Sequence, residues 1–192
     1  RSVRGEPSPE CDVMTLPRFT VVVPTRERSD TLRHTLRTCT AQDYDALCIL
    51  VSDNASADAT ETVVRSFVDP RIRYIRTPKR VSMASNWEFA VSHVDDGFVL
   101  VLGDDDGLLP HAIRDLAEIL TETRCQAVSW NEAVYTWPGC LGGKVANRLK
   151  FSLRRTTEVR NARQWLDKVI AYEQLYKQLP SLYWGVVHRD VL

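Results

Sequence analysis

The chain has 192 residues, of which 44% are hydrophobic and 26% are charged, as is ordinary for a globular protein. The 25 Lys and Arg residues balance the 25 Asp and Glu residues, so there is no overall basic bias of the kind that nucleic-acid binding requires. Apolar runs such as FVLVL (98–102) are far shorter than the roughly 18 residues of a membrane span. We therefore expect one domain, or one domain with an appendage, and no partner nucleic acid.

The cysteines and the chain ends bear on cellular location. There are five cysteines, an odd number, and none forms a CxxC pair. This favours reduced thiols in a cytoplasmic protein over a disulfide framework. The first residues do not have the pattern of a signal peptide, so we expect none. Because the chain starts at Arg1 rather than Met and stops at Leu192 straight after an apolar run, we expect a fragment that is truncated at its C-terminus.

Strands and helices are predicted in alternation from residue 18 onward, after a polar tail over 1–17 that contains three prolines. FTVVV (19–23) and LCILVS (47–52) are short apolar runs that predict buried strands. Between them, Ser29 is a candidate N-cap for a helix, since Leu32, Leu36 and Cys39 recur at helical spacing.

The alternation continues through the next segments. Val63, Val64 and Phe67 form the apolar face of a second helix, and RIRYIR (71–76) alternates as a strand at or near a sheet edge does. A helix over 82–94, the strand FVLVL, a helix with Pro110 in its first turn, and the strand CQAVSW (125–130) follow. This order predicts an α/β fold with a mostly parallel sheet and helices on both faces.

The pattern is weaker beyond residue 130. Residues 161–177 predict an amphipathic helix and SLYWGVVHR (181–189) a last strand. We expect the alternating α/β half to cover 18–130 and a second, partial half to cover 131–192. The basic stretch 148–160 is interpreted as a solvated face, with an anionic acceptor or a membrane surface as the alternative.

Polar residues follow three of the predicted strands. They are Thr25 and Arg26 after the first, Asp53 and Asn54 after the second, and Asp104, Asp105 and Asp106 after the fourth. Ligands of open parallel sheets bind beyond the carboxyl ends of the strands, so these residues should converge on one edge.

The three adjacent aspartates repel one another, and no Lys or Arg in their own stretch offsets them. A hard divalent cation would, because Mg²⁺ and Mn²⁺ prefer oxygen ligands and often take one or two carboxylates plus substrate phosphates. A solvated acidic turn is the alternative. The sequence holds no calcium loop, no GxxxxGK[ST] phosphate loop and no GxGxxG after the first strand.

Three segments together resemble the family 2 glycosyltransferases of the GT-A fold: FTVVVPTRERSDTLRHTLRTCTAQDY, ILVSDNASADAT and VLVLGDDDGLLP. The resemblance covers residues 18–130 well and the rest loosely, which implies a nucleotide-sugar-binding half over 18–130 and a partial acceptor-side half over 131–192. It implies a Rossmann-like sheet, a nucleotide-diphosphate sugar as donor, a hydroxyl acceptor such as a saccharide, and inversion at the anomeric carbon. It also implies Mn²⁺ or Mg²⁺ as cofactor and a cytoplasmic enzyme, with peripheral contact at the inner membrane face left open.

The resemblance assigns roles to individual residues. Nucleotide contacts are implied for Pro24, Thr25, Arg26, Asp53, Arg73, Asn86 and Asp104. Asp53 would accept a hydrogen bond from the base, commonly uracil N3–H, and the Lys79 and Arg80 pair is the alternative to Arg73. The metal is implied at Asp105, supported by Asp106. Gly103 stands where the family's acidic signature has its first Asp, which is a departure from the pattern. Weaker acceptor-side assignments fall on Trp184 and His188.

Inverting transfer also needs a general base for the acceptor hydroxyl. The family's base lies in the C-terminal half, and we expect it beyond Leu192, with Asp190, Glu132 and Glu173 as weak candidates. Two other interpretations remain open. One is a sugar-nucleotide-binding domain without transfer activity; the other is a nucleotidyltransferase, which the absence of glycine from VVVPTRERSD disfavours.

Overall fold

The structure is a computed structural model that describes residues 16–130, 133–136, 148–151, 159–161, 163, 164, 167 and 185–192. The expected tail over 1–17 lies almost entirely outside these residues, as do Trp184, Glu132, Glu173 and most of the expected helix over 161–177.

A six-stranded sheet forms the centre of the molecule, with the strand order β3-β2-β1-β4-β8-β5. Its strands are β1 (Phe19–Thr25), β2 (Leu47–Asp53), β3 (Ile72–Arg76), β4 (Phe98–Val101), β5 (Ala127–Ser129) and β8 (Gly185–His188). β1 to β4 are parallel, and β8 is antiparallel to both of its neighbours. The expected mostly parallel α/β sheet is confirmed. Because β8 lies between β4 and β5, the sheet draws on both sides of the expected division at residue 130.

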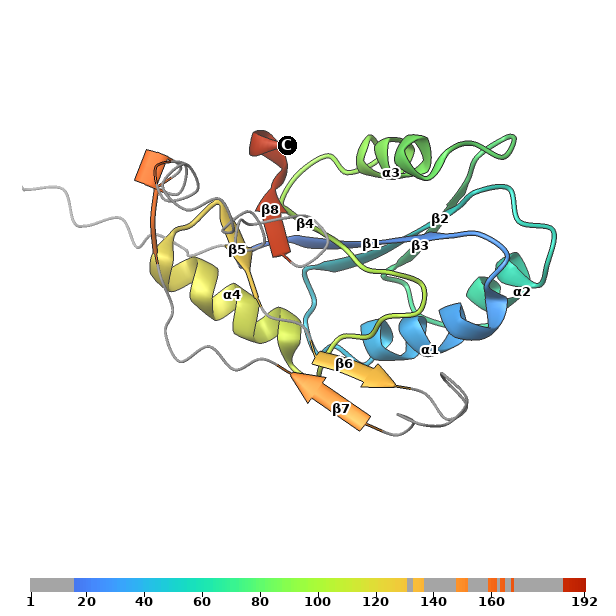
Figure 1. Ribbon diagram of the computed structural model, residues 1–192, viewed down its shortest axis with the longest axis horizontal. Helices are drawn as coiled ribbons and strands as arrows, with labels where there is room; N and C mark the ends of the chain where they lie inside the picture. Colours follow the sequence, from blue (N-terminus) through green and yellow to red (C-terminus); the bar gives the residue numbers. More distant parts are fainter. Residues whose placement is uncertain are drawn as a thin grey trace, which may run out of the picture.

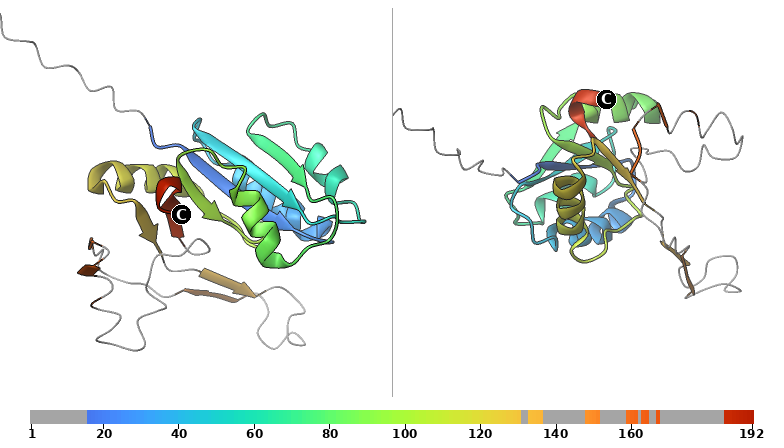
Figure 2. Two further views of the ribbon diagram at one scale, coloured as in Figure 1. Left: turned by 90° about the horizontal axis from the view of Figure 1, so that it is seen from above. Right: turned by 90° about the vertical axis from the view of Figure 1, so that its left-hand side faces the viewer.

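Helices cover both faces of the sheet, as Figures 1 and 2 show. α3 (Met83–Val91) packs on one face over Val22, Leu50, Val99 and Val101. The opposite face carries α1 (Ser29–Thr40), α2 (Thr60–Arg65) and α4 (Ala112–Thr123). These three helices and the sheet share one apolar cluster, which includes Leu36, Val64, Ile113, Ile49 and Leu100. The runs of β-branched residues in β1 and β2 are explained by this burial on two sides.

The edge position of β3 explains its alternating sequence. β3 pairs only with β2 in the strand order, and its residues are half-buried or exposed. The prediction of an edge strand over 71–76 is therefore confirmed. A separate two-stranded antiparallel ribbon consists of β6 (Ala133–Thr136) and β7 (Arg148–Phe151), and a short 3₁₀ turn, η3 (Arg189–Val191), follows β8.

Two predicted helix starts differ from the structure. α1 begins at Ser29 itself, and the preceding Arg28 makes no side-chain cap. α4 begins at Ala112, two residues after Pro110, and His111 before it has a left-handed backbone (φ 66°). The sequence pattern identified both helices, but their first turns depend on contacts with other segments.

The start of β4 depends on a close approach at Gly97. This glycine has a positive φ of 84°, and a Cβ there would lie 2.5 Å from the carbonyl oxygen of Arg18. The same oxygen accepts the N–H of Phe98 at 2.8 Å, the first bond between the β1 and β4 strands. A side chain at position 97 would therefore both strain the backbone and push this bond apart.

We predict that Gly97→Ala lowers the free energy of unfolding by about 2 kcal/mol or more, from backbone strain and the displaced Arg18 carbonyl. Urea denaturation followed by circular dichroism measures the change. Asp95→Ala, at an exposed position two residues away, is the matched control and should stay within about 0.5 kcal/mol of wild type. Equal midpoints for the two variants would contradict the prediction.

Candidate functional site

The ends of three neighbouring strands meet in register at one edge of the sheet. Thr25, the last residue of β1, pairs with Asp53, the last residue of β2. Asp53 in turn pairs with Arg76, the last residue of β3. In Figure 1 the segments that follow β1, β2 and β4 all reach the right of the molecule, so the expected convergence at the carboxyl edge is found. We call this the carboxyl edge below.

Asp53 is a fully buried carboxylate with three donors. Its Oδ1 accepts the N–H of Ser56 at 2.9 Å, and its Oδ2 accepts the Tyr74 hydroxyl at 2.6 Å and Arg76 Nη1 at 3.0 Å. Burial, together with the hydrogen bond to Asp53, raises the pKa of Tyr74 to about 12, so this hydroxyl stays protonated as a donor. A carboxylate has about four acceptor positions, and three are filled here; the side chain has no exposed surface through which a further donor could reach the fourth.

Asn54 fixes the loop that leads from β3 to α3. Its amide mimics a strand: Nδ2 donates to the carbonyl of Val81 at 2.9 Å, and Oδ1 accepts the N–H of Val81 at 2.8 Å. The backbone carbonyl of Asp53 accepts the N–H of Thr77 at the other end of the loop. The loop is therefore held against the end of β2 by paired hydrogen bonds.

Two of the three adjacent aspartates converge on one guanidinium nitrogen. Arg28 Nη1 lies 2.6 Å from Asp105 Oδ2 and 3.3 Å from Asp104 Oδ1. Asp104 is nearly buried, and its Oδ2 accepts the Thr25 hydroxyl at 2.8 Å. Burial raises the pKa of Asp104, although Thr25 and Arg28 oppose this, and the hydrogen bond to Asp105 raises the pKa of Arg28. The counter-charge that the stretch 97–110 lacks is thus supplied by the turn after β1.

Asp106 is fixed through its backbone. Its N–H donates to the carbonyl of Gly103 at 3.1 Å, and its carbonyl accepts the hydroxyl of Thr35 from α1 at 2.7 Å. The next residue, Gly107, lies against Thr38, where a Cβ would come within 3.2 Å of Thr38 Cγ2. The acidic turn is therefore packed onto α1 and is not a freely solvated loop.

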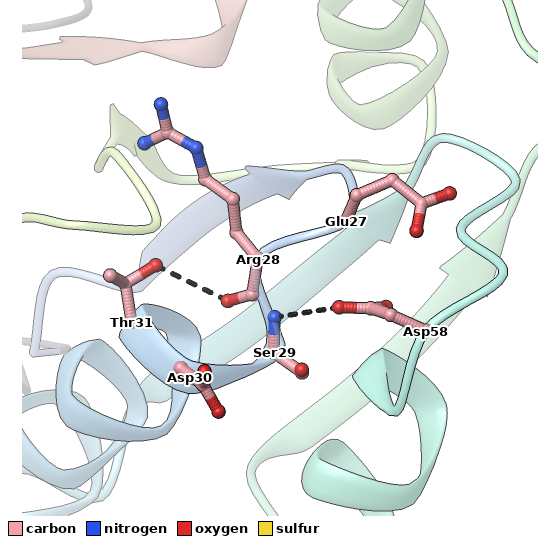
Figure 3. A pocket seen from close by; sticks show the side chains of 6 residues that line it. All are labelled: Glu27, Arg28, Ser29, Asp30, Thr31 and Asp58. Carbon is pink, nitrogen blue, oxygen red and sulfur yellow. Dashed lines mark hydrogen bonds between the residues drawn. The ribbon is translucent and has the colours of Figure 1, made fainter.

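A surface pocket opens at the turn between β1 and α1 (Figure 3), and Glu27, Arg28, Ser29, Asp30, Thr31 and Asp58 line it. The expected cap of α1 by Ser29 is wrong. Ser29 instead donates its N–H to Asp58 Oδ2 at 3.0 Å, and the other oxygen of Asp58 accepts the N–H and hydroxyl of Thr60, the first residue of α2. Asp58 thereby caps the start of two helices. In Figure 3 the Arg28 side chain extends away from Asp58.

Arg73 and Asn86 have surroundings that differ from those the resemblance implies. Arg73 lies apart from the carboxyl edge, and its Nη1 donates to the carbonyl of His93 at 3.4 Å, just beyond the C-terminal end of α3. The basic residue beside Asp53 is Arg76. Asn86 is buried, and both ends of its amide bond to Ser52 of β2. Pro24 is half-buried and Arg26 is exposed.

His188 and Asp190 lie at the opposite edge of the sheet. His188 pairs with Phe98, the first residue of β4, and its ring meets the Phe98 ring edge-on at 4.9 Å. Phe98 is the first residue of β4, whereas Asp104 lies in the turn beyond the strand's other end at Val101, so the two positions are at opposite ends of β4. Asp190 follows in η3 and contacts His188. The structure therefore separates both residues from the carboxyl edge, and Trp184 lies outside the described residues.

Within the described parts of the chain, no three His, Cys, Asp or Glu side chains are grouped so as to hold a metal ion. The chemistry of the acidic turn nonetheless suits a divalent cation. Asp104 and Asp105 already hold one cationic nitrogen between them, and Mg²⁺ or Mn²⁺ commonly takes one or two carboxylates and completes its shell with water and substrate phosphates.

Residues 20–169 match the family model described as Glycosyl transferase family 2. The match covers most of the chain, and the chain belongs to this family. Its α/β sheet has the GT-A architecture that the resemblance implied.

Two curated relatives are glycan-biosynthesis proteins. The chain is 32% identical over 110 residues to the GalNAc(5)-diNAcBac-PP-undecaprenol beta-1,3-glucosyltransferase of Campylobacter jejuni, which covers 56% of this chain and 36% of the relative. It is 27% identical over 103 residues to the succinoglycan biosynthesis protein ExoO of Rhizobium meliloti, which covers 54% of this chain and 30% of that protein. The chain thus spans about a third of the length of these relatives.

Solved structures share the fold. Residues 1–349 of Staphylococcus aureus TarS in complex with UDP-GlcNAc superpose with a TM-score of 0.53 and 20% identity, over 57% of this chain and 33% of that TarS chain. The mannosyltransferase of Pyrobaculum calidifontis in complex with GDP-Man and Mn²⁺ gives a TM-score of 0.50 and 24% identity, over 65% of this chain and 37% of that enzyme. Among the residues that the structure describes, none of the helices combines the length and apolar content that spanning a bilayer requires.

We predict that Asp58→Ala lowers the free energy of unfolding by about 1–2 kcal/mol at pH 7, because both helix starts lose an acceptor. Partial burial alone would raise the pKa of Asp58, but the hydrogen bonds from Thr60 and Ser29 outweigh it and lower the pKa to about 2. The unfolded value is about 3.9, so the contribution is complete above pH 4 and is lost as the pH falls toward 2.

Urea denaturation of both proteins between pH 7 and pH 3 measures this difference. The gap between wild type and Asp58→Ala should narrow below pH 4. Asp30→Ala removes an exposed carboxylate from the same first turn of α1 and is the control. A gap that is constant down to pH 3, or that Asp30→Ala reproduces, would show that Asp58 does not act through these bonds.

Proposed function

We propose that this glycosyltransferase binds a nucleotide-diphosphate sugar at the carboxyl edge and transfers the sugar, with inversion, to a hydroxyl acceptor. One observation carries the proposal. Two polar groups lie on the same edge of one sheet. One is Asp53 with its partner Arg76, and the other is the pair Asp104 and Asp105, which together hold a guanidinium. A nucleoside diphosphate has a base at one end and charged phosphates at the other, and this arrangement matches both.

The nucleoside is proposed to lie over the ends of β1 and β2, against Pro24, Thr25, Arg26 and Asp53. UDP is the favoured donor nucleotide by the resemblance, which pairs an aspartate at this position with uracil N3–H. Because Asp53 is fully buried and already has three donors, the base would bond to it only after displacing one of them. Arg76 takes the role first given to Arg73, because its guanidinium lies beside Asp53 and is 40% exposed. Asn86 is proposed to act indirectly, by holding β2 through Ser52.

The diphosphate is proposed to lie at Asp104 and Asp105, with Asp106 beside them. These residues would hold Mn²⁺ or Mg²⁺, and the bound ion would neutralise charge on the departing diphosphate. The chain's own contribution is to fix the two carboxylates. Thr25 orients Asp104, and the contact of Asp106 with Thr35 anchors the turn on α1.

The acceptor side is less complete. The residues proposed there, His188 and the weak base candidate Asp190, lie at the other edge of the sheet, so neither reaches an acceptor bound near Asp104. A domain that binds the donor without transferring its sugar is therefore the second candidate. Arg148 and Lys150 are exposed on β7, which keeps contact with an anionic acceptor or a membrane surface within the proposal.

We predict that UDP binds this protein with Mn²⁺ present and that Asp105→Asn weakens the binding at least about tenfold, which corresponds to about 1.4 kcal/mol. The substitution removes a charge from the metal pair while keeping the side chain's shape. Isothermal titration of UDP with Mn²⁺ and then with EDTA measures both effects, and GDP and dTDP test the choice of base.

Glu118→Gln is the matched control, since it removes one exposed carboxylate from α4 and should bind UDP as wild type does. Failure of UDP, GDP and dTDP to bind with any metal would overturn the donor-site proposal. Donor binding with no hydrolysis or transfer of a UDP-sugar, across a panel of saccharide acceptors, would instead support the second candidate.

A further inference from the structure

Arg28 occupies the space between the two carboxylates that are proposed to hold the metal. A single nitrogen, Nη1, contacts Asp105 at 2.6 Å and Asp104 at 3.3 Å, so the guanidinium stands where a shared cation would stand. Arg28 therefore neutralises the pair that Mn²⁺ or Mg²⁺ would have to bind. This inference rests on the proposed function and concerns how metal binding and donor binding affect each other.

We propose that Arg28 is an internal counter-ion that competes with the divalent metal for Asp104 and Asp105, and that it transfers to the donor diphosphate when metal and donor bind together. Arg28 is then a positioning residue. It keeps the acidic pair ready without metal and couples metal binding to donor binding.

The three side chains differ in how firmly they are held. Asp104 has a side chain only 10% exposed and a second bond to Thr25, so it stays in place when its partner leaves. Asp105 is 49% exposed and Arg28 52% exposed, so both contact water along half of their surface. Moving the guanidinium costs little desolvation, because Arg28 already reaches solvent.

The location of Arg28 gives it a second partner. It lies on the turn after β1, directly before α1, and its side chain crosses to the turn after β4. A diphosphate held by a metal at Asp105 would approach this same turn. Guanidinium groups bind phosphate oxygens bidentately and are weakly hydrated, so the exchange of carboxylate for phosphate keeps the charge paired.

Competition and exchange predict a linkage that can be measured. Metal alone must displace Arg28 and leave it unpaired, so its affinity is reduced. Metal with UDP gives Arg28 a new partner, so each ligand strengthens the other, and the coupling is reciprocal. Without the guanidinium, metal alone should bind more tightly and UDP should add less.

The experiment measures Mn²⁺ binding by electron paramagnetic resonance of the free ion, without and with UDP. We expect Arg28→Gln to bind Mn²⁺ alone at least about threefold more tightly than wild type, the scale of a partly exposed ion pair. We also expect the factor by which UDP raises Mn²⁺ affinity to be smaller in Arg28→Gln. Arg28→Lys, which keeps the charge, should return the affinity of Mn²⁺ alone toward wild type.

Arg33→Gln is the control for loss of one positive charge, because Arg33 is exposed on α1. Circular dichroism of each variant establishes that it is folded, and Arg28→Met serves if Arg28→Gln is not. Equal or weaker Mn²⁺ binding in Arg28→Gln, no binding in any variant, or a gain that Arg33→Gln matches would overturn the inference. Should Arg28→Gln not fold, Arg28→Met, which also removes the charge, is measured in its place: tighter binding of Mn²⁺ alone than in wild type would support the displacement of Arg28, and unchanged or weaker binding would overturn it. The titration of UDP into wild type tests the proposed function separately, since that can fail while the Mn²⁺ difference persists.

Discussion

A buried negative charge at the end of β2 organises the carboxyl edge. Asp53 is completely removed from water, and a carboxylate in that position is stable only when donors surround it. The donors come from the β3 side chains Tyr74 and Arg76 and from the N–H of Ser56 in the following loop. The hydrogen bonds to this one carboxylate therefore fix the end of the edge strand β3 and the start of the loop to α2.

The constraint extends from Asp53 to the neighbouring loops through its backbone and through Asn54. The Asp53 carbonyl and the Asn54 amide together hold both ends of the segment between Thr77 and Val81. Arg76 adds a bond to the carbonyl of Ser56, whose hydroxyl accepts the N–H of Glu27 in the turn after β1. Three loops from three strands are thus joined by hydrogen bonds before any ligand is bound, which is the preorganisation that a binding site needs.

Much of this architecture could be predicted from the sequence, because buried apolar residues recur at the spacing of a strand or a helix. The β-branched runs of β1 and β2, the alternation of β3 and the helical spacing of Leu32, Leu36 and Cys39 each report a local environment. Register leaves no such mark. Arg73 and Arg76 both belong to RIRYIR, and only the pairing of Asp53 with Arg76 decides which one meets the carboxylate.

The helix start at Ser29 was mispredicted for a related reason. A serine before an apolar run is a valid local signal for a cap. In the structure, however, the N–H of Ser29 donates to Asp58, which lies in another loop. The counter-charge for the acidic turn cannot be found in the neighbouring sequence either, because Arg28, which supplies it, is 76 residues from Asp104. Contacts of this kind become visible only when the parallel strands bring their ends together.

The direction of β8 limits where the acceptor chemistry can come from. An antiparallel strand enters the sheet at the edge where its parallel neighbours end, and it leaves where they begin. β8 therefore has Gly185 at its end nearer the carboxyl edge and His188 at the far end, opposite Phe98. A residue close behind His188 in sequence, such as Asp190, is remote from the proposed diphosphate site, however well its chemistry suits a base. Proton transfer requires contact through a hydrogen bond or one water, so the acceptor's base must come from a segment that reaches the edge where Asp104 and Asp105 lie.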